Sequence, residues 1–208
     1  MITENKILMA QARASLSGRW TVAVCAMLVY GLLLGVASGI LQFSVFKVGL
    51  GAAVAVQYIL FFAIASPFML GLATFFLALS RGEQVRIEQI FAGFNRFGTA
   101  LAANLLVVAF TLLWMLLLIV PGIIASISYS QTFYILADDP GMDAMSAISK
   151  SKKMMRGYKW KYFCLGLRFI GWVLLGILTL GIGFFWLTPY MQTSFAKFYD
   201  DVKTSYSE

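Results

Sequence analysis

Long runs of apolar residues, separated by short polar segments, make up most of this chain. A helix needs about 20 apolar residues to cross hydrocarbon about 30 Å thick, and several runs reach that length. The runs are continuously apolar, and lipid offers no partner to an open sheet edge, so the pattern predicts helices. We predict six membrane-spanning helices, at residues 20–41, 50–79, 99–119, 121–137, 162–180 and 182–199.

The expected fold class is therefore all-α, a polytopic transmembrane helical bundle, with residues 1–208 as a single integral membrane domain. The second run is longer than one crossing requires. As a helix of about 30 residues it would measure about 45 Å, so it must tilt, bend at Pro67 or extend beyond the bilayer. We predict one long helix over 50–79, and two half-spans with a re-entrant segment are the alternative.

Charged residues lie between the apolar runs or at their ends, with Arg168 as the exception. With six spans, nearly all lysines and arginines fall on one side of the membrane, and only Lys47 falls on the other. Cytoplasmic loops carry the excess of Lys and Arg, so both termini are predicted to be cytoplasmic. A split 50–79 run would instead place the later basic loops on opposite sides.

Composition supports the membrane class, because 61% of the residues are hydrophobic and only 12% are charged, against about 25% charged in soluble domains. No cleavable signal sequence is evident, so the first apolar run is expected to be retained. The net charge of +7 lies mostly on the predicted cytoplasmic face. It would either attract anionic inner-leaflet headgroups or only fix the topology.

Membrane lipid is the partner we expect, and a membrane-protein partner or a second copy of the chain is also compatible with the sequence. Nucleic acid is not an expected partner, because the basic residues are spread over membrane-flanking helices and form no recognition motif.

A polar segment precedes spans one, three and five. These segments run over 3–18, 86–98 and 139–157, and each is predicted to be an amphipathic interfacial helix stopped by its final glycine. In the third, Asp139 is expected to cap the helix and Pro140 to occupy its first position. In the middle one, apolar residues share a face at helical spacing: Ile87, Ile90, Phe91, Phe94 and Phe97.

The returning spans each contain a proline followed by small or polar residues. Pro67, Pro121 and Pro189 are predicted to kink these helices. The hydroxyl groups that follow them either line a polar cavity or satisfy carbonyls freed by the prolines. Interfacial helix, span, turn and span thus recur, which predicts three tandem parallel repeats at residues 1–80, 81–137 and 138–208, with chance similarity as the alternative.

The chain contains no histidine, which removes His-based triads and imidazole metal sites. No catalytic residue, cofactor or metal site is predicted, and we expect the protein not to be an enzyme. Asp138, Asp139 and Asp143 form an acidic cluster that we interpret as a helix cap rather than a cation site. Cys25 and Cys164 fall inside predicted spans and are interpreted as packing residues, not a disulfide.

Arg168 is the sharpest candidate for function, because an ionisable side chain inside a membrane is a functional hypothesis by default. It would bind a phosphate headgroup or anionic substrate, or else snorkel to the interface or form a structural ion pair. A candidate intramembrane polar site combines Arg168 with Gln131, Ser126 and Ser130. Asn104 is a lesser candidate that interhelical hydrogen bonding would explain.

A stripe of glycines in the first span permits close approach of another helix. Gly31, Gly35 and Gly39 recur at intervals of four. The stripe would pack either within the monomer or against a second copy of the chain.

Several short strings over nearly the whole length are distinctive together: Ala12-Arg13, Ser80-Arg81-Gly82-Glu83, Phe91-x-Gly93-Phe94, Pro121-Gly122-Ile123, Tyr134-Ile135-Leu136-Ala137-Asp138, Gly171-Trp172, Gly181-Ile182-Gly183 and Pro189-Tyr190. In these strings the chain resembles the bacterial integral-membrane family called domain of unknown function 975. The resemblance implies a multi-span protein, largely from Gram-positive bacteria, and hence the plasma membrane. It implies no activity and supplies no site residues, and a basic residue at position 168 is not part of the family pattern.

Two functions are compatible with these observations. The first is a non-enzymatic membrane protein in cell-envelope organisation or an accessory membrane subunit, favoured by the absence of any catalytic constellation. The second is a small transporter or channel for a lipid, peptide or other small solute. A continuous polar cavity lined by Ser126, Ser130, Gln131 or Arg168 would favour transport.

Overall fold

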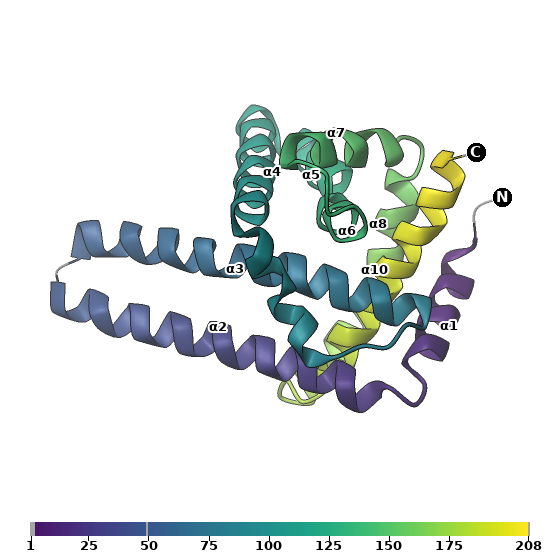
Figure 1. Cartoon of the computed structure of the whole chain (residues 1–208), viewed down its shortest axis with the longest axis horizontal. Helices are drawn as coiled ribbons and strands as arrows, with labels where there is room; N and C mark the ends of the chain where they lie inside the picture. The colour runs from purple at the N-terminus through teal and green to yellow at the C-terminus, as the bar shows by residue number, and fades with distance from the viewer. Residues whose placement is uncertain (1–2, 49, 208) are drawn as a thin grey trace.

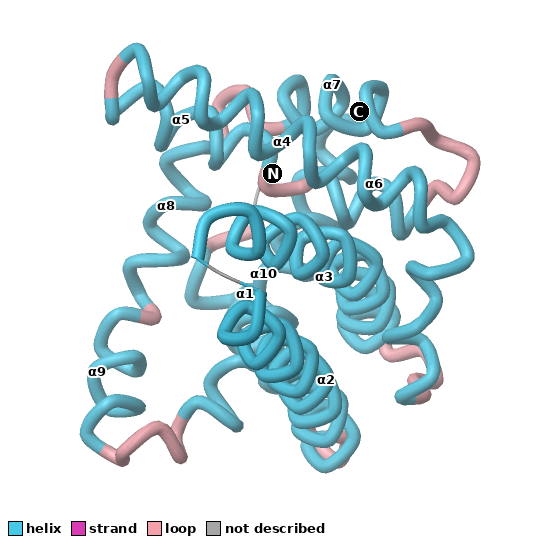
Figure 2. Tube along the Cα trace, turned by 90° about the vertical axis from the view of Figure 1, so that its left-hand side faces the viewer, coloured by secondary structure: helices cyan, strands magenta, loops and turns pink. Residues whose placement is uncertain are grey.

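A computed structural model shows the chain as an assembly of helices (Figure 1). It describes residues 3–48 and 50–207, and within them all side chains except those of residues 40, 41, 43–56 and 207. In this part of the chain every regular element is helical (Figure 2). In order, the elements are α1 (Asn5–Leu16), α2 (Trp20–Val48), α3 (Leu50–Arg81), η1 (Ile87–Arg96), α4 (Phe97–Leu117), α5 (Ile119–Tyr129), α6 (Thr132–Asp138), α7 (Ala144–Met154), α8 (Lys159–Arg168), α9 (Ile170–Leu178) and α10 (Phe184–Ser207).

Among the described residues, five helical segments are long and apolar enough to cross a membrane: Trp20–Gly39, Gln57–Arg81, Ile87–Leu117, Ile119–Asp138 and Lys159–Leu178. They correspond in order to the first five predicted spans, and a multi-pass membrane protein is plausible on this basis. The sixth predicted span, 182–199, lies in α10 and is not among the five. The C-terminal half of α10 carries Lys197, Asp200, Asp201 and Lys203, which make it more polar than the other segments.

Three hairpins of helices give the chain its shape: α2 with α3, α4 with α5, and α9 with α10. In Figure 1 the α2–α3 hairpin projects away from the remaining helices. Large apolar side chains are exposed on each hairpin, and the exposed fraction reaches 87% at Leu116 and 95% at Leu180, near two of the turns. Such extended apolar surface is typical of a region that contacts other apolar matter.

The long second run forms one helix, α3, as predicted, with Pro67 inside it. Pro189 likewise lies inside α10. Pro121 does not interrupt a helix, however, because it lies in the first turn of α5. Backbone N–H groups in a first turn have no partner within the helix, so proline is tolerated there. The chain changes direction at Leu118, which has an extended backbone conformation.

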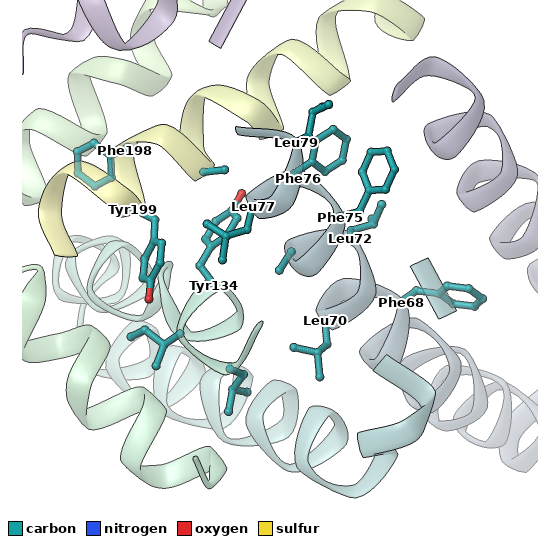
Figure 3. Close-up of a cluster of buried hydrophobic side chains, with 14 of the residues drawn as sticks. Phe68, Leu70, Leu72, Phe75, Phe76, Leu77, Leu79, Tyr134, Phe198 and Tyr199 are labelled. Carbon is teal, nitrogen blue, oxygen red and sulfur yellow. The ribbon is translucent and has the colours of Figure 1, made fainter. Parts of the chain in front are cut away.

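The buried core lies where the ends of the hairpins meet. Phe75, Phe76 and Leu79 from the C-terminal half of α3 are fully buried, as are Phe198 and Tyr199 of α10 (Figure 3). The Tyr199 ring stacks on Tyr134 of α6, with ring centroids 5.7 Å apart. The core thus joins α3 and α10, the last helices of the first and third hairpins, to α6, the helix that follows the second hairpin.

The first amphipathic segment forms a helix as predicted. Leu8, Ala12 and Leu16 of α1 recur at intervals of four and are all buried. The Asn5 side chain also donates to the carbonyl oxygen of Lys161 in α8, with N···O 3.0 Å. The helix ends at Leu16, and Gly18 follows with a φ of 74°, in the left-handed region that glycine favours.

The middle amphipathic segment departs from the prediction. It is a 3₁₀-helix, and Gly98 does not stop it, because α4 begins at Phe97 and Gly98 lies in its first turn. A 3₁₀-helix has three residues per turn, so Ile90 and Gly93 face inward and are buried, whereas Phe91, Phe94 and Phe97 are exposed. The predicted apolar face is therefore wrong, because it includes the exposed Phe91, Phe94 and Phe97 and omits the buried Gly93.

Glycines allow η1 to lie directly on α3. A Cβ added at Gly93 would lie 1.9 Å from the Pro67 carbonyl oxygen, and one added at Gly71 would lie 1.8 Å from that of Ile90. Real atoms cannot approach so closely, so the two backbones touch only because both positions lack a side chain.

The third amphipathic helix starts later than predicted. Asp139 and Pro140 lie in a turn, where the Asp139 carboxylate accepts from the Gly141 N–H at 3.1 Å. Asp143 caps α7 instead, since its carboxylate accepts from the Ser146 N–H at 3.0 Å. Hydrogen bonds from Ser146 hold the pKa of Asp143 below its ordinary value. Gly157 follows in the left-handed conformation, as predicted.

Candidate functional site

The predicted intramembrane polar site is only partly assembled. Gln131 Nε2 donates to Ser130 Oγ at 2.8 Å, so these neighbours in sequence are also neighbours in contact. Ser126 Oγ donates to the carbonyl oxygen of Ile123 in its own helix. Arg168 is exposed at the end of α8, and its side chain forms no hydrogen bond or ion pair with the described residues. The expected structural ion pair of Arg168 is therefore not present in this part of the chain.

Gln131 is fully buried between α5 and α6. Its backbone N–H donates to Ser151 Oγ at 3.3 Å, and Ser151 Oγ donates in turn to the Ser128 carbonyl oxygen at 2.8 Å. Ser151 belongs to α7, so this side chain holds the α5–α6 junction against α7. These contacts favour a structural role for Ser151, whereas the buried Gln131 Oε1 has no hydrogen-bond partner among the described residues.

The hydroxyl groups after the prolines bond to their own helices. Thr74 Oγ1 donates to the Leu70 carbonyl oxygen at 3.0 Å, and Thr193 Oγ1 donates to that of Pro189 at 2.8 Å. Ser194 makes the same contact four residues back. These are local contacts to carbonyls of the same helix, and the carbonyls are not the ones freed by Pro67 and Pro189, which lie four residues before each proline. Both interpretations of these hydroxyl groups therefore stay predictions. Asn104 is explained by an interhelical hydrogen bond, as predicted.

The glycine stripe of α2 does not pack within the described part of the monomer. A Cβ added at Gly31, Gly35 or Gly39 would meet no atom within 4 Å. Of the two interpretations, contact with a second copy or a partner remains a prediction. Cys25 and Cys164 are free thiols, so the expected absence of a disulfide between them is confirmed.

The most prominent polar constellation joins Arg81, Asp138 and Asp200, and we call it the base cluster. Arg81 Nη1 lies 2.7 Å from Asp138 Oδ1, and Nη2 lies 2.7 Å from Asp200 Oδ1. The Arg81 Nε also donates to Asp200 at 3.1 Å. One guanidinium thus bridges two carboxylates, using the planar fork that suits arginine to such contacts.

Further donors surround the base cluster. Tyr199 O–H donates to Asp138 Oδ2 at 2.9 Å, and Lys203 forms an ion pair with the same oxygen. Beside it, Lys161 Nζ contacts Asp201 at 2.6 Å. The Thr3 hydroxyl also donates to Asp201 at 2.6 Å, which brings the beginning of the chain to the same place.

Sequence reasoning missed this cluster. Arg81 and Asp200 are 119 positions apart, and no local pattern connects them. The signal available was that a charged residue closely follows each predicted returning span. These residues are Arg81, the last residue of α3, Asp138, the last residue of α6, and Asp200 within α10. Among the described residues no group of His, Cys, Asp or Glu could hold a metal ion. The acidic residues around position 138 thus serve in ion pairs and in a helix cap.

An aromatic groove lies at the other end of α10, between α1, α9 and the start of α2. Its volume is about 360 Å³. It is lined by Arg13, Trp20, Trp172, Leu175, Gly176, Thr179, Gly183, Trp186, Leu187 and Tyr190. We call it the Trp groove. None of the four residues of the predicted polar site lines it.

A search of curated proteins and a search of solved structures find no match to this chain. A family model, by contrast, matches residues 115–205, which run from the end of α4 into α10 and include Asp138, Asp200 and the α9–α10 side of the Trp groove. The resemblance drawn from the sequence is thereby confirmed over residues 115–205, which match the family described as Protein of unknown function (DUF975).

Proposed function

We propose that this chain is a non-enzymatic integral membrane protein of the bacterial plasma membrane that acts in cell-envelope organisation or as an accessory membrane subunit. Three apolar hairpins embed in the bilayer, and their charged ends form a fixed platform on the cytoplasmic face. The observation that carries the proposal is the base cluster, in which Arg81 at the end of α3 contacts both Asp138 at the end of α6 and Asp200 in α10. One arginine thus joins the last helices of the first and third hairpins to α6, the helix that follows the second.

The base cluster also supports the proposed six crossings. Arg81 contacts both Asp138 and Asp200, so the three residues must lie on the same side of the membrane. The chain between Arg81 and Asp138 must then cross an even number of times, as must the chain between Asp138 and Asp200. Two crossings in each interval, with α2 and α3 before them, give six. Thr3 contacts Asp201, so the N-terminal region shares this side, which the excess of Lys and Arg makes cytoplasmic.

The polar groups of the hairpins support a structural role over catalysis. The candidate hydroxyls donate to carbonyls of their own helices, and Gln131 lies in a packed junction. A small transporter or channel is the second hypothesis. Against it, Arg168 has no hydrogen-bond or ion-pair partner among the described residues, and none of the four residues of the predicted polar site lines the Trp groove or a second cavity beside Asp200 and Asp201.

The proposal is tested by crosslinking in cells followed by purification in a mild detergent. An accessory subunit is expected to recover a defined membrane partner, and Arg81→Ala is expected to weaken that recovery, because the platform loses its bridge. Arg156→Ala, a change at an exposed arginine elsewhere on the same face, serves as the control. Flux of solutes into liposomes that contain the protein, with no partner recovered, would instead favour the transport hypothesis.

A further inference from the structure

We propose that the Trp groove binds one phospholipid with an anionic headgroup, its phosphate at Arg13 and an acyl chain along the tryptophans. The inference rests on the proposed membrane location and names a partner and a site for it. The groove has a long apolar wall and a single cationic residue, Arg13, in its lining. Such a site complements an amphiphile, which has an apolar chain and a charged headgroup.

The apolar wall comes from three helices. Trp20 begins α2, Trp172 and Leu175 lie on α9, and Trp186 and Leu187 lie on α10. Thus three of the five tryptophans of the chain face one cavity. Tryptophan has an apolar body and one N–H donor, and it is enriched where hydrocarbon meets headgroups.

The groove is continuous with the exposed apolar surface of the α9–α10 hairpin. Trp172, Leu175 and Trp186 line it and are each more than half exposed, and Leu180 at the turn is almost fully exposed. In a chain embedded in a bilayer, this surface faces lipid. An occupant therefore reaches the groove from the hydrocarbon, which favours an acyl chain over a water-soluble ligand.

Arg13 selects the headgroup. Its side chain is exposed, and among the described residues it forms no hydrogen bond or ion pair. Arg19, the next arginine, differs because its guanidinium donates to the carbonyl oxygens of Glu83 and Gly82 at 2.9 Å. The N–H donors of the Arg13 guanidinium are therefore accessible to a ligand, and a guanidinium binds phosphate oxygens well. Tyr190, which also lines the groove, interacts electrostatically with Arg13.

Quenching of tryptophan fluorescence by brominated lipids tests this site. Trp114 and Trp160 are changed to Phe, so that only Trp20, Trp172 and Trp186 emit. The protein is placed in phosphatidylcholine vesicles that contain a fixed fraction of either dibrominated phosphatidylglycerol or dibrominated phosphatidylcholine. We expect the groove to prefer phosphatidylglycerol by about fivefold, the effect of one basic residue near anionic lipid.

Arg13→Gln is expected to reduce this preference to about one, and Arg13→Lys to retain most of it. Lys6→Gln is the matched control, because Lys6 is an exposed cation on the same helix but does not line the groove. It should leave the preference unchanged. Far-ultraviolet circular dichroism verifies that each variant is folded. If Arg13→Gln does not fold, the lipid preference of Arg13→Lys is still compared with that of the unsubstituted protein.

Three results would overturn the proposal: equal quenching by the two lipids, a preference that survives Arg13→Gln, or no quenching of the groove tryptophans by either lipid. In the last case, a variant that retains only Trp160 separates the two proposals. If both lipids quench Trp160, the chain lies in the membrane and only the groove assignment fails.

Discussion

Arg81→Ala should destabilise the protein by about 2 kcal/mol, an effect of about 30-fold on the folding equilibrium. The substitution removes a guanidinium that bridges two carboxylates, with both short N···O distances at 2.7 Å. Loss of one partner from a fully buried ion pair costs about 3–5 kcal/mol, and loss of an exposed pair costs about 0–1 kcal/mol.

The base cluster lies between these limits. The side chain of Arg81 is 31% exposed, whereas that of Asp138 is only 11% exposed. Both carboxylates keep other donors in the variant, because Asp138 retains Tyr199 and Lys203 and Asp200 retains the Ser80 hydroxyl at 3.3 Å. Neither acid is left as an uncompensated buried charge, so the cost should not reach the upper limit.

The assay is reversible unfolding of the protein in mixed micelles with increasing sodium dodecyl sulfate, monitored by circular dichroism. Arg156→Ala is the control and should change the free energy of unfolding by no more than about 0.5 kcal/mol. The double variant with Asp200→Ala should reveal a coupling energy of about 1 kcal/mol with Arg81. The reasoning is refuted if Arg81→Ala behaves like the control and shows no coupling to Asp200.

Three further changes test other parts of the structure by the same unfolding assay or by oligomer size. Asn104→Leu should cost about 0.6 kcal/mol, the average interhelical hydrogen bond in a membrane, because Asn104 Nδ2 donates to Ser66 Oγ at 2.8 Å; an unchanged stability would exclude that contact. Gly93→Ala should lower the free energy of unfolding by about 3 kcal/mol or prevent folding, since its Cβ would overlap the α3 backbone. Gly98→Ala is the control and should have little effect, because a Cβ added at Gly98 meets no atom within 4 Å. Gly35→Leu should leave the monomer intact and dissociate any dimer built on the α2 stripe, as measured by size-exclusion chromatography with light scattering; a dimer unaffected by the change would rule out that interface.

The helices themselves could be predicted because hydrophobic periodicity and length are local properties of the sequence. The apolar run 50–79 becomes α3, and the first amphipathic segment becomes α1, which buries Leu8, Ala12 and Leu16 at helical spacing. Helix ends were less predictable. η1 follows the threefold period of a 3₁₀-helix. The cap of α7 is Asp143 instead of Asp139, because the Asp139 carboxylate accepts from the Gly141 N–H in the preceding turn.

The polar contacts could not be predicted because they depend on tertiary structure. Arg168 attracted attention as a lone cation in an apolar run, yet it contacts no polar group in the described residues. In the sequence Arg81 is an ordinary basic residue after a predicted span, yet its guanidinium contacts Asp138 and Asp200 on two helices distant in sequence. Likewise the Trp groove gathers residues from positions 13 to 190, which no local motif connects.

The topology is the central claim, and labelling of single cysteines in intact cells tests it most directly. Cys25 and Cys164 are replaced by alanine, and one cysteine at a time is introduced at Lys6, Lys47 or Lys153. The side chain of Lys47 lies outside the described residues, so this measurement also supplies what the structure does not describe. We predict that a membrane-impermeant maleimide labels position 47 from outside the cell, and positions 6 and 153 only in inverted vesicles. Labelling of positions 47 and 153 from the same side would contradict the six crossings and the common cytoplasmic platform.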